Sequence, residues 1–183
     1  MYFKNYNYII KMKHRITSED IACLVPALNS ILDGAYLTQI YDGMKDNTKI
    51  IIMKLRNRIE DKSITYYLLI ESGIRMHTIE SFTSIRQVPS GFIGKLRKEI
   101  GDKRLYPLQQ IGTDRSIDFL FSNEKHFIIE FYDRGNFILT DKDYKIIYIA
   151  RSYNFKETKI DVGVIYPKDE IAKAGIPLTK DIS

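Results

Sequence analysis

The hydrophobic period of this chain changes at Gly34, from that of a helix to that of strands. After Gly34, apolar residues alternate with polar ones in short segments rich in Ile, Tyr and Thr, which favour strands. Before it, residues 17–34 (TSEDIACLVPALNSILDG) carry apolar side chains at helical spacing, namely Ile21, Leu24, Val25, Leu28, Ile31 and Leu32. One long helix followed by many short strands predicts an α+β fold, with antiparallel sheets packed against that helix and a second, short one.

The ends of both helices are marked by local chemistry. Thr17 can cap the first helix, and Asp20, three residues later, completes a capping box. Ser90 can cap a second helix that Gly101 ends. Cys23 lies next to the apolar stripe of the first helix, so we expect a small buried hydrophobe rather than a nucleophile.

The strands are expected in two groups, before and after the second helix. The turns SNEK, DRGN and DKD suit antiparallel hairpins in the second group. From Lys156 onward the apolar pattern weakens, and two prolines predict a loop-like tail. The predicted strands are 37–41, 49–55, 65–71 and 75–79, then 104–111, 116–121, 127–132, 136–140 and 145–151.

The totals restrict the class of protein. A chain of 183 residues fits one domain and buries enough surface to fold without a metal or disulfide. A single cysteine excludes an internal disulfide and favours a reducing cytosol, so a cytoplasmic location is expected. No apolar run approaches the roughly 18 residues of a membrane helix. Neither metal-ligand spacing nor a phosphate loop nor a nucleophile motif is present, so we expect no enzyme, no cofactor and no metal.

Positive charge is concentrated in the first part of the chain. Residues 1–104 contain 17 Lys and Arg against 11 Asp and Glu, whereas residues 105–183 contain 11 against 12. The stretch PSGFIGKLRKEIGDKRL (89–105) alone carries five cations. Such asymmetry indicates an anionic partner such as nucleic acid. Lys95, Arg97 and Lys98 have two interpretations: they complement the dipole at a helix C-terminus, or they contact phosphate.

Four stretches in order carry a resemblance to a known family. The chain resembles the N-terminal (NFACT-N) domain of the NFACT family, whose members are ribosome quality control factors and proteins once labelled fibronectin-binding. The similarity runs from about Met12 to Tyr166, so we expect residues 1–11 to be an N-terminal extension and residues 12–183 to be the domain, as a fragment of a longer protein. The stretches are MKHRITSEDIACLVPALNSILDGAYLTQIYD (12–42), ESGIRMHT (71–78), PSGFIGKLRKEIGDKRL (89–105), and DRSIDFLF with EFYDRGNFILTD (114–141).

The resemblance implies a fold, a function and partners. The fold would be a β-sandwich similar to the N-terminal domain of formamidopyrimidine-type DNA glycosylases, without their N-terminal proline nucleophile. The function would be non-catalytic binding of tRNA on obstructed large ribosomal subunits, in support of C-terminal tailing of stalled chains. An E3 ubiquitin ligase (Listerin) would be a partner of the full-length protein. Two alternatives remain: a scaffold that docks on ribosomal protein or on the ligase, and a surface adhesin.

The resemblance also implies site residues. It connects Asp20, Asp114 and Arg115 with tRNA handling. A guanidinium can fork onto phosphate or stack on a base, and Asp114 could hold that fork in place. We expect this pair at a sheet edge near the cationic helix; the alternative is a turn residue and a solvated strand residue. Strand tyrosines such as Tyr132 could stack on bases, although half-buried core positions are commoner.

Overall fold

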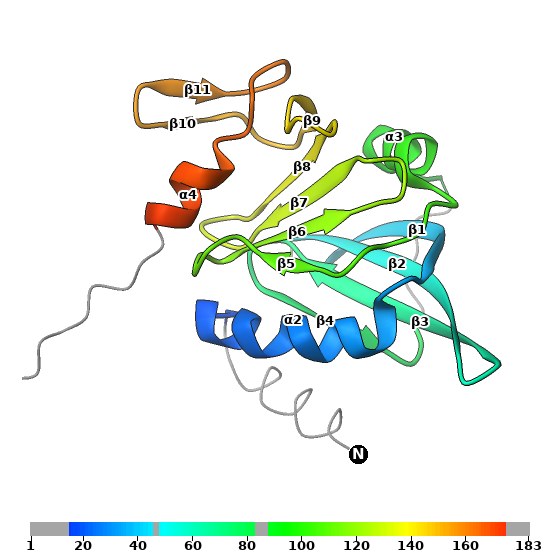
Figure 1. Ribbon diagram of the computed structural model, residues 1–183. Helices are drawn as coiled ribbons and strands as arrows, with labels where there is room; N and C mark the ends of the chain where they lie inside the picture. The colour runs from blue at the N-terminus through cyan, green and yellow to red at the C-terminus, as the bar shows by residue number, and fades with distance from the viewer. Residues whose placement is uncertain (1–14, 46–47, 83–87, 175–183) are drawn as a thin grey trace, which may run out of the picture.

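Two antiparallel sheets, of four and five strands, face each other in the computed structural model, which describes residues 15–45, 48–82 and 88–174 (Figure 1). The predicted α+β class is confirmed. The first sheet has the order β1-β2-β3-β4, formed by Tyr36–Lys45, Thr48–Ile59, Lys62–Glu71 and Arg75–Ile79. The second has the order β5-β6-β7-β8-β9, formed by Gln109–Gln110, Ser116–Leu120, His126–Glu130, Asn136–Thr140 and Ile146–Ile149. The helices are α2 (Ser18–Leu32), α3 (Gly91–Ile100) and α4 (Lys168–Ala174).

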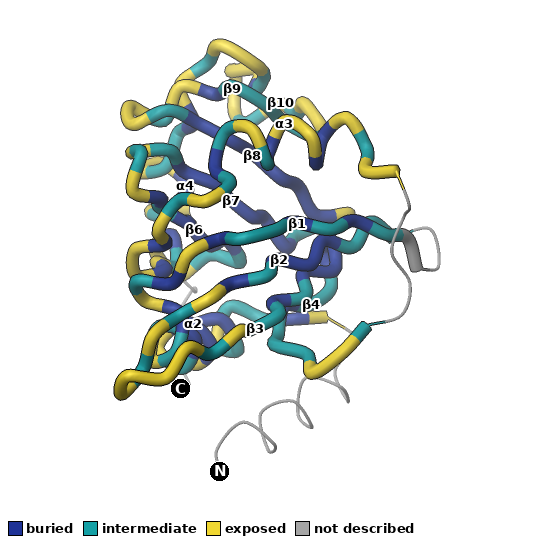
Figure 2. Tube along the Cα trace, turned by 90° about the vertical axis from the view of Figure 1, so that its right-hand side faces the viewer, coloured by how far each residue is buried: buried dark blue, intermediate teal, exposed yellow. Residues whose placement is uncertain are grey.

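The main core lies between the two sheets and under both longer helices. Alternate residues of each strand point into it, as period-two patterning requires, and Figure 2 shows these buried positions along β1, β2 and β6 to β8. Phe92 of α3 stacks on Phe137 of β8, with ring centroids 5.8 Å apart. Fully buried members from the two sheets include Leu37, Met53, Leu55, Leu68, Ile117, Phe119, Phe127 and Ile129.

The expectation of a loop-like tail after Lys156 is wrong for residues 156–174, and the rest of that tail lies outside the described residues. A hairpin of β10 (Tyr153–Phe155) and β11 (Thr158–Ile160) is followed by α4, and this C-terminal segment covers the outer face of the five-stranded sheet. Its buried side chains are Ile160, Tyr166 and Ile171, which pack in a second cluster with Ile128 and Ile138 of that sheet. Burial on both faces explains why every residue of β7 and β8 is buried.

Capping fixes both helix starts as predicted. The Thr17 hydroxyl accepts a hydrogen bond from the Asp20 amide (3.2 Å), and the Asp20 carboxylate accepts one from the Thr17 amide (3.0 Å). At α3, Ser90 caps the amide of Ile93 at 3.5 Å. The burial predicted for Cys23 is wrong. Cys23 lies beside the buried stripe of α2 but not in it, and its thiol is exposed to solvent. None of the helices in the described ranges is both long and apolar enough to cross a membrane.

Candidate nucleic-acid interface

The turn between β5 and β6 carries Asp114 and Arg115. The Asp114 carboxylate accepts hydrogen bonds from the main-chain amide of Arg115 (2.8 Å) and from the Ser116 hydroxyl (3.4 Å). It therefore holds the backbone of the turn, not the guanidinium that we expected it to hold. The half-buried side chain of Arg115 has no hydrogen-bond or ion-pair partner within residues 15–45, 48–82 and 88–174. Its guanidinium donors are thus available to a ligand.

Gln110 joins this turn to the start of α2. Its amide nitrogen donates to the carbonyl of Ser18 (3.1 Å) and to the carbonyl of Asp114 (2.9 Å). The capped end of α2, which contains Asp20, is thereby brought to the same end of the molecule as the Asp114 turn. Sequence reasoning missed Gln110, because its first contact spans 92 residues and leaves no local pattern.

An aromatic hollow of about 300 Å³ lies beside Asp114. Its walls come from the end of β7, from β10 and from α4, and the lining side chains are Asp114, Tyr132, Tyr153, Asn154, Phe155, Ile171 and Ala174. The rings of Tyr132 and Tyr153 line the hollow, while their hydroxyls donate to the carboxylate of Glu130. Tyr132 is therefore half-buried: its ring faces the hollow, and its hydroxyl is held by Glu130.

Glu130 is a fully buried carboxyl group behind this wall. Its Oε2 atom also accepts a hydrogen bond from the Tyr166 hydroxyl (3.1 Å), whereas its Oε1 atom is buried and has no hydrogen-bond partner in the described part of the chain. Burial raises the pKa of Glu130 from 4.5 to about 7, against the opposing effect of the hydroxyl donors. Near neutral pH, about half of the Glu130 carboxyl groups therefore remain protonated.

The basic helix lies at the other end of β6. The C-terminal end of α3 contacts the β6–β7 turn, where the Asn123 side-chain amide donates to the Glu99 carbonyl (2.7 Å). Arg115 and Ser122 are seven residue steps apart along the extended chain, which is roughly 23 Å at ~3.3 Å per residue. Arg115 directly precedes β6, whereas α3 contacts the turn that follows β6, so the expectation that Arg115 lies near the cationic helix is wrong.

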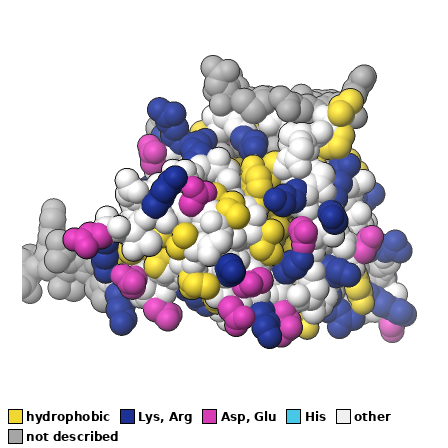
Figure 3. Space-filling view, turned by 90° about the horizontal axis from the view of Figure 1, so that it is seen from above, with side chains coloured by type: hydrophobic (Ala, Val, Ile, Leu, Met, Phe, Trp, Pro, Cys, Tyr) yellow, Lys and Arg dark blue, Asp and Glu magenta, His cyan; other side chains and the backbone are white. Residues whose placement is uncertain are grey.

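The three cations of α3 differ in their surroundings. The Arg97 guanidinium donates twice to the Ile40 carbonyl, from Nε at 3.0 Å and from Nη2 at 2.6 Å, and so ties α3 to β1. Lys95 lies above the Tyr148 ring, 5.5 Å from its centroid, and Lys98 is exposed. In the view of Figure 3, Lys and Arg side chains are densest on the right-hand half of the molecule, where α3 lies.

Comparison with known proteins places the chain in a family. The family described as "NFACT N-terminal and middle domains" matches residues 17–170. The ribosome quality control complex subunit NEMF of Homo sapiens and that of Mus musculus are each 37% identical to the chain over 172 residues, which is 91% of this chain. The NEMF homolog of Drosophila melanogaster is 41% identical over 145 residues, or 78% of this chain. The chain spans only about 15% of the length of these relatives.

Solved structures give the same fold. The N-terminal domain of the fibronectin-binding protein PavA from Streptococcus pneumoniae matches with a TM-score of 0.67 and 21% identity, over 81% of this chain and 60% of that one. The N-terminal part of a fibronectin/fibrinogen-binding protein from Streptococcus suis matches with a TM-score of 0.67 and 23% identity, over 80% and 58%. The likeness to DNA glycosylases stays a prediction. By the match over residues 17–170 and by its identity to the NEMF proteins, the chain belongs to the NFACT family.

Proposed function

We propose that this domain is a non-catalytic RNA-binding part of a cytoplasmic ribosome quality control factor. In this role it recognises tRNA on an obstructed large ribosomal subunit and supports C-terminal tailing of the stalled chain. Three findings support the proposal: the family, the names of the relatives as ribosome quality control subunits, and the concentration of cations in the first half of the chain.

One observation carries the proposal most directly: the guanidinium of Arg115, which has no partner among the described residues, lies on a turn that Asp114 and Gln110 hold in place. A planar guanidinium binds phosphate with two parallel hydrogen bonds or stacks on an unpaired base. The neighbouring aromatic hollow has about the volume of a small ligand pocket (~300 Å³) and offers rings for a base. Each oxygen of Asp114 retains a lone pair that can accept a base amine.

The remaining cationic residues would contact a different part of the same RNA. Lys95 and Lys98 belong to α3, whose end contacts the turn after β6. That turn lies roughly 23 Å along the strand from Arg115, a separation that an extended or large folded polyanion can bridge. In this arrangement Asp20 acts mainly through the cap of α2, which Gln110 joins to the Asp114 turn. Arg97 would contribute by holding α3 against β1.

Binding of tRNA at increasing salt concentrations tests the proposal. We expect the wild-type domain to bind tRNA at low salt with a log–log salt slope that reflects several phosphate contacts. Arg115→Gln should weaken binding about tenfold, whereas Lys142→Gln, which removes the same charge from the exposed β8–β9 turn, should have little effect. Absence of any tRNA binding at low salt, or equal effects of the two substitutions, would contradict the proposal.

A second candidate function is docking on ribosomal protein or on an E3 ubiquitin ligase, which is favoured because the related NEMF proteins are subunits of a ribosome quality control complex. Pull-down of large ribosomal subunits before and after nuclease treatment separates the two. Capture that survives both nuclease treatment and a high-salt wash would support protein docking. Capture that is lost after nuclease treatment and also in the high-salt wash would support RNA binding.

A further inference from the structure

A row of two arginines and a tyrosine crosses three adjacent chain segments on the outer face of the four-stranded sheet. Tyr36 of β1 pairs directly with Arg56 of β2, and on its other side it forms a bridge with Arg104. Residues directly opposite in antiparallel pairs project from the same face. All three side chains are exposed, whereas their chain neighbours Leu55 and Leu105 are fully buried. The row therefore points into solvent as a unit.

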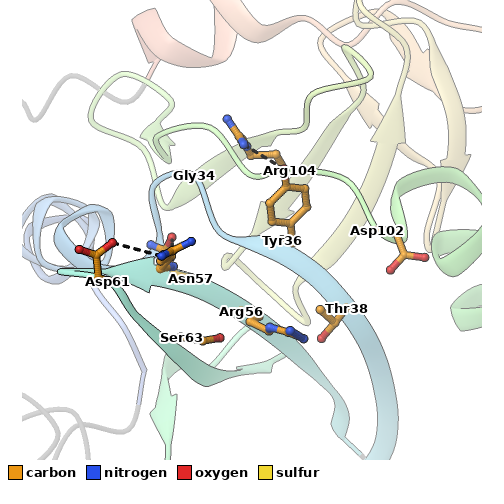
Figure 4. Close-up of a pocket in the computed structure, with 10 residues that line it drawn as sticks. Gly34, Tyr36, Thr38, Arg56, Asn57, Asp61, Ser63, Asp102 and Arg104 are labelled. Carbon is orange, nitrogen blue, oxygen red and sulfur yellow. Dashed lines mark hydrogen bonds and ion pairs between the residues drawn. The ribbon is translucent and has the colours of Figure 1, made fainter.

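The row lies in a groove of about 830 Å³ (Figure 4). The groove is formed where the end of α2, the starts of β1 and β3, the end of β2 and the exit of α3 meet. Thr38, Asn57 and Ser63 add polar side chains to its lining. This end of the molecule is the α3 end, opposite to the Asp114 turn.

Arg104 is held in a defined position by the ring beside it. Its guanidinium carbon lies 5.2 Å from the centroid of the Tyr36 ring, and its Nη2 atom donates to the Tyr36 hydroxyl at 2.9 Å. A guanidinium has five N–H donors, so most of those on Arg104 remain available. Tyr36 is 47% exposed, unusually open for a large aromatic side chain. A rigid cation beside an open ring is the arrangement that stacks a base and binds its phosphate.

The charges of the groove favour an anion. Arg58 pairs with Asp61 at 3.2 Å, but both side chains are highly exposed, so this pair is weak and salt-screened. Asp102 is the other acidic residue of the lining, and its single negative charge is outnumbered by the two positive charges of Arg56 and Arg104. Beyond the lining, Lys98 and Lys103 continue the positive charge along the exit of α3.

We propose that this groove is a second RNA contact, which takes a single-stranded or looped segment with one base on Tyr36 and its phosphates on Arg56 and Arg104. The inference rests on the proposed RNA-binding function and assigns it a second, separate site. Single-stranded RNA fits better than an acidic protein surface, because an acidic peptide would use the arginines but has no need of an exposed ring between them. RNA bound at both ends of the molecule would be fixed in orientation.

Binding of a short unstructured oligouridine to the whole domain, followed by fluorescence anisotropy at several salt concentrations, tests the site. The double substitution Arg56→Gln with Arg104→Gln should lower the log–log salt slope by about 1.4, at ~0.7 for each single-strand phosphate lost. Lys142→Gln again serves as the control for removal of an exposed cation. The midpoint of thermal unfolding should be unchanged in this variant, because the two arginine side chains are exposed.

Substitutions of the ring separate stacking from charge. Tyr36→Phe keeps the ring but removes the hydroxyl that holds Arg104, so it should weaken oligouridine binding less than threefold. Tyr36→Ala removes the stacking surface, and we expect a loss of at least about fivefold. Equal effects of the two ring substitutions would show that no base stacks on Tyr36 and would overturn the inference.

The experiments distinguish an error in the groove inference from an error in the proposed function. If Arg115→Gln weakens tRNA binding while the double arginine variant behaves like Lys142→Gln with both RNAs, the groove inference is wrong and the proposed function stands. If the wild-type domain binds neither RNA at low salt, both are wrong. The groove assignment would also be overturned if the double arginine variant kept its RNA binding but no longer bound an acidic protein that the wild-type domain binds.

Discussion

Gly73 and Gly135 meet back to back, where the β3–β4 turn of one sheet touches the β7–β8 turn of the other. A Cβ atom on Gly135 would lie 2.2 Å from the amide nitrogen of Gly73 and 2.6 Å from the hydroxyl oxygen of Ser72. Both glycines have positive φ, +71° and +73°. The Ser72 hydroxyl donates to the Arg134 carbonyl at 2.9 Å across the same contact. This junction closes the sandwich at the end that carries the Asp114 turn.

Gly135→Ala should therefore destabilise the domain strongly. The new methyl group costs about 1–2 kcal/mol for the left-handed backbone and a further ~1–3 kcal/mol for overlap with the opposing turn. Gly163→Ala is the matched control, because Gly163 has a φ of +84° but no atom near its Cβ position. Urea unfolding should show a loss about 2 kcal/mol larger for Gly135→Ala. Equal losses would mean that the two turns move apart easily.

The stability of the domain should depend on the protonation of Glu130. Between pH 4.5, its usual pKa, and about 7, its pKa in the folded protein, only the folded state holds the proton. The folded state thus binds more protons in this window, so the free energy of unfolding falls as pH rises through it, by roughly 3 kcal/mol in total. Glu130→Gln mimics the protonated acid, because its carbonyl oxygen still accepts the tyrosine hydroxyls.

Denaturant unfolding at pH 5 and pH 8 measures this effect. We expect Glu130 to make the free energy of unfolding of the wild-type domain larger at pH 5 than at pH 8. The difference in this free energy between the two pH values should be smaller in Glu130→Gln. A pH profile that is the same in both proteins would show that Glu130 is already ionised in the folded state at pH 5.

Local patterns predicted the two longer helices and most strands, but not their placement, and only Gln109–Gln110 of the strand predicted at 104–111 forms one. The capping box at Thr17 and the cap at Ser90 depend on a few neighbouring residues, so they could be predicted. The distance between Arg115 and α3 depends instead on which end of β6 each one meets, which no local pattern records. The C-terminal segment was missed for a related reason: Ile160, Tyr166 and Ile171 are too widely spaced to show a period, yet they cover a whole face of the sheet.

The cations of α3 should divide between stability and RNA binding. Arg97→Gln removes two hydrogen bonds to the Ile40 carbonyl, so we expect a loss of about 1.5–3 kcal/mol in the free energy of unfolding. Lys98→Gln removes the same charge from an exposed position and should change stability by less than about 0.5 kcal/mol. In tRNA titrations, Lys98→Gln should instead lower the salt slope. Unchanged stability in Arg97→Gln would show that its guanidinium is available to RNA after all.

The C-terminal segment should be anchored through Lys168. Its ammonium group donates to the Tyr144 hydroxyl at 2.7 Å and lies 3.7 Å from the Asp118 carboxylate, which the Tyr144 hydroxyl also contacts at 2.6 Å. Lys168→Met should raise amide hydrogen exchange across α4 about tenfold or more, while Lys173→Met, at the exposed end of the same helix, should not. Equal exchange in the two variants would assign the anchoring to Ile171 and Tyr166 alone.

Gln110 should affect RNA binding through the position of Arg115, without contacting RNA itself. Gln110→Ala removes the two hydrogen bonds that join the Asp114 carbonyl to the start of α2, each worth about 0.5–1.5 kcal/mol. The turn would then sample more conformations, and we expect tRNA affinity to fall severalfold and amide exchange at residues 112–116 to rise. A double-mutant cycle with Arg115→Gln tests the mechanism, because a residue that acts through Arg115 loses its effect once that guanidinium is gone. Additive losses would instead indicate that Gln110 contacts the RNA, or that it weakens binding through the fold as a whole.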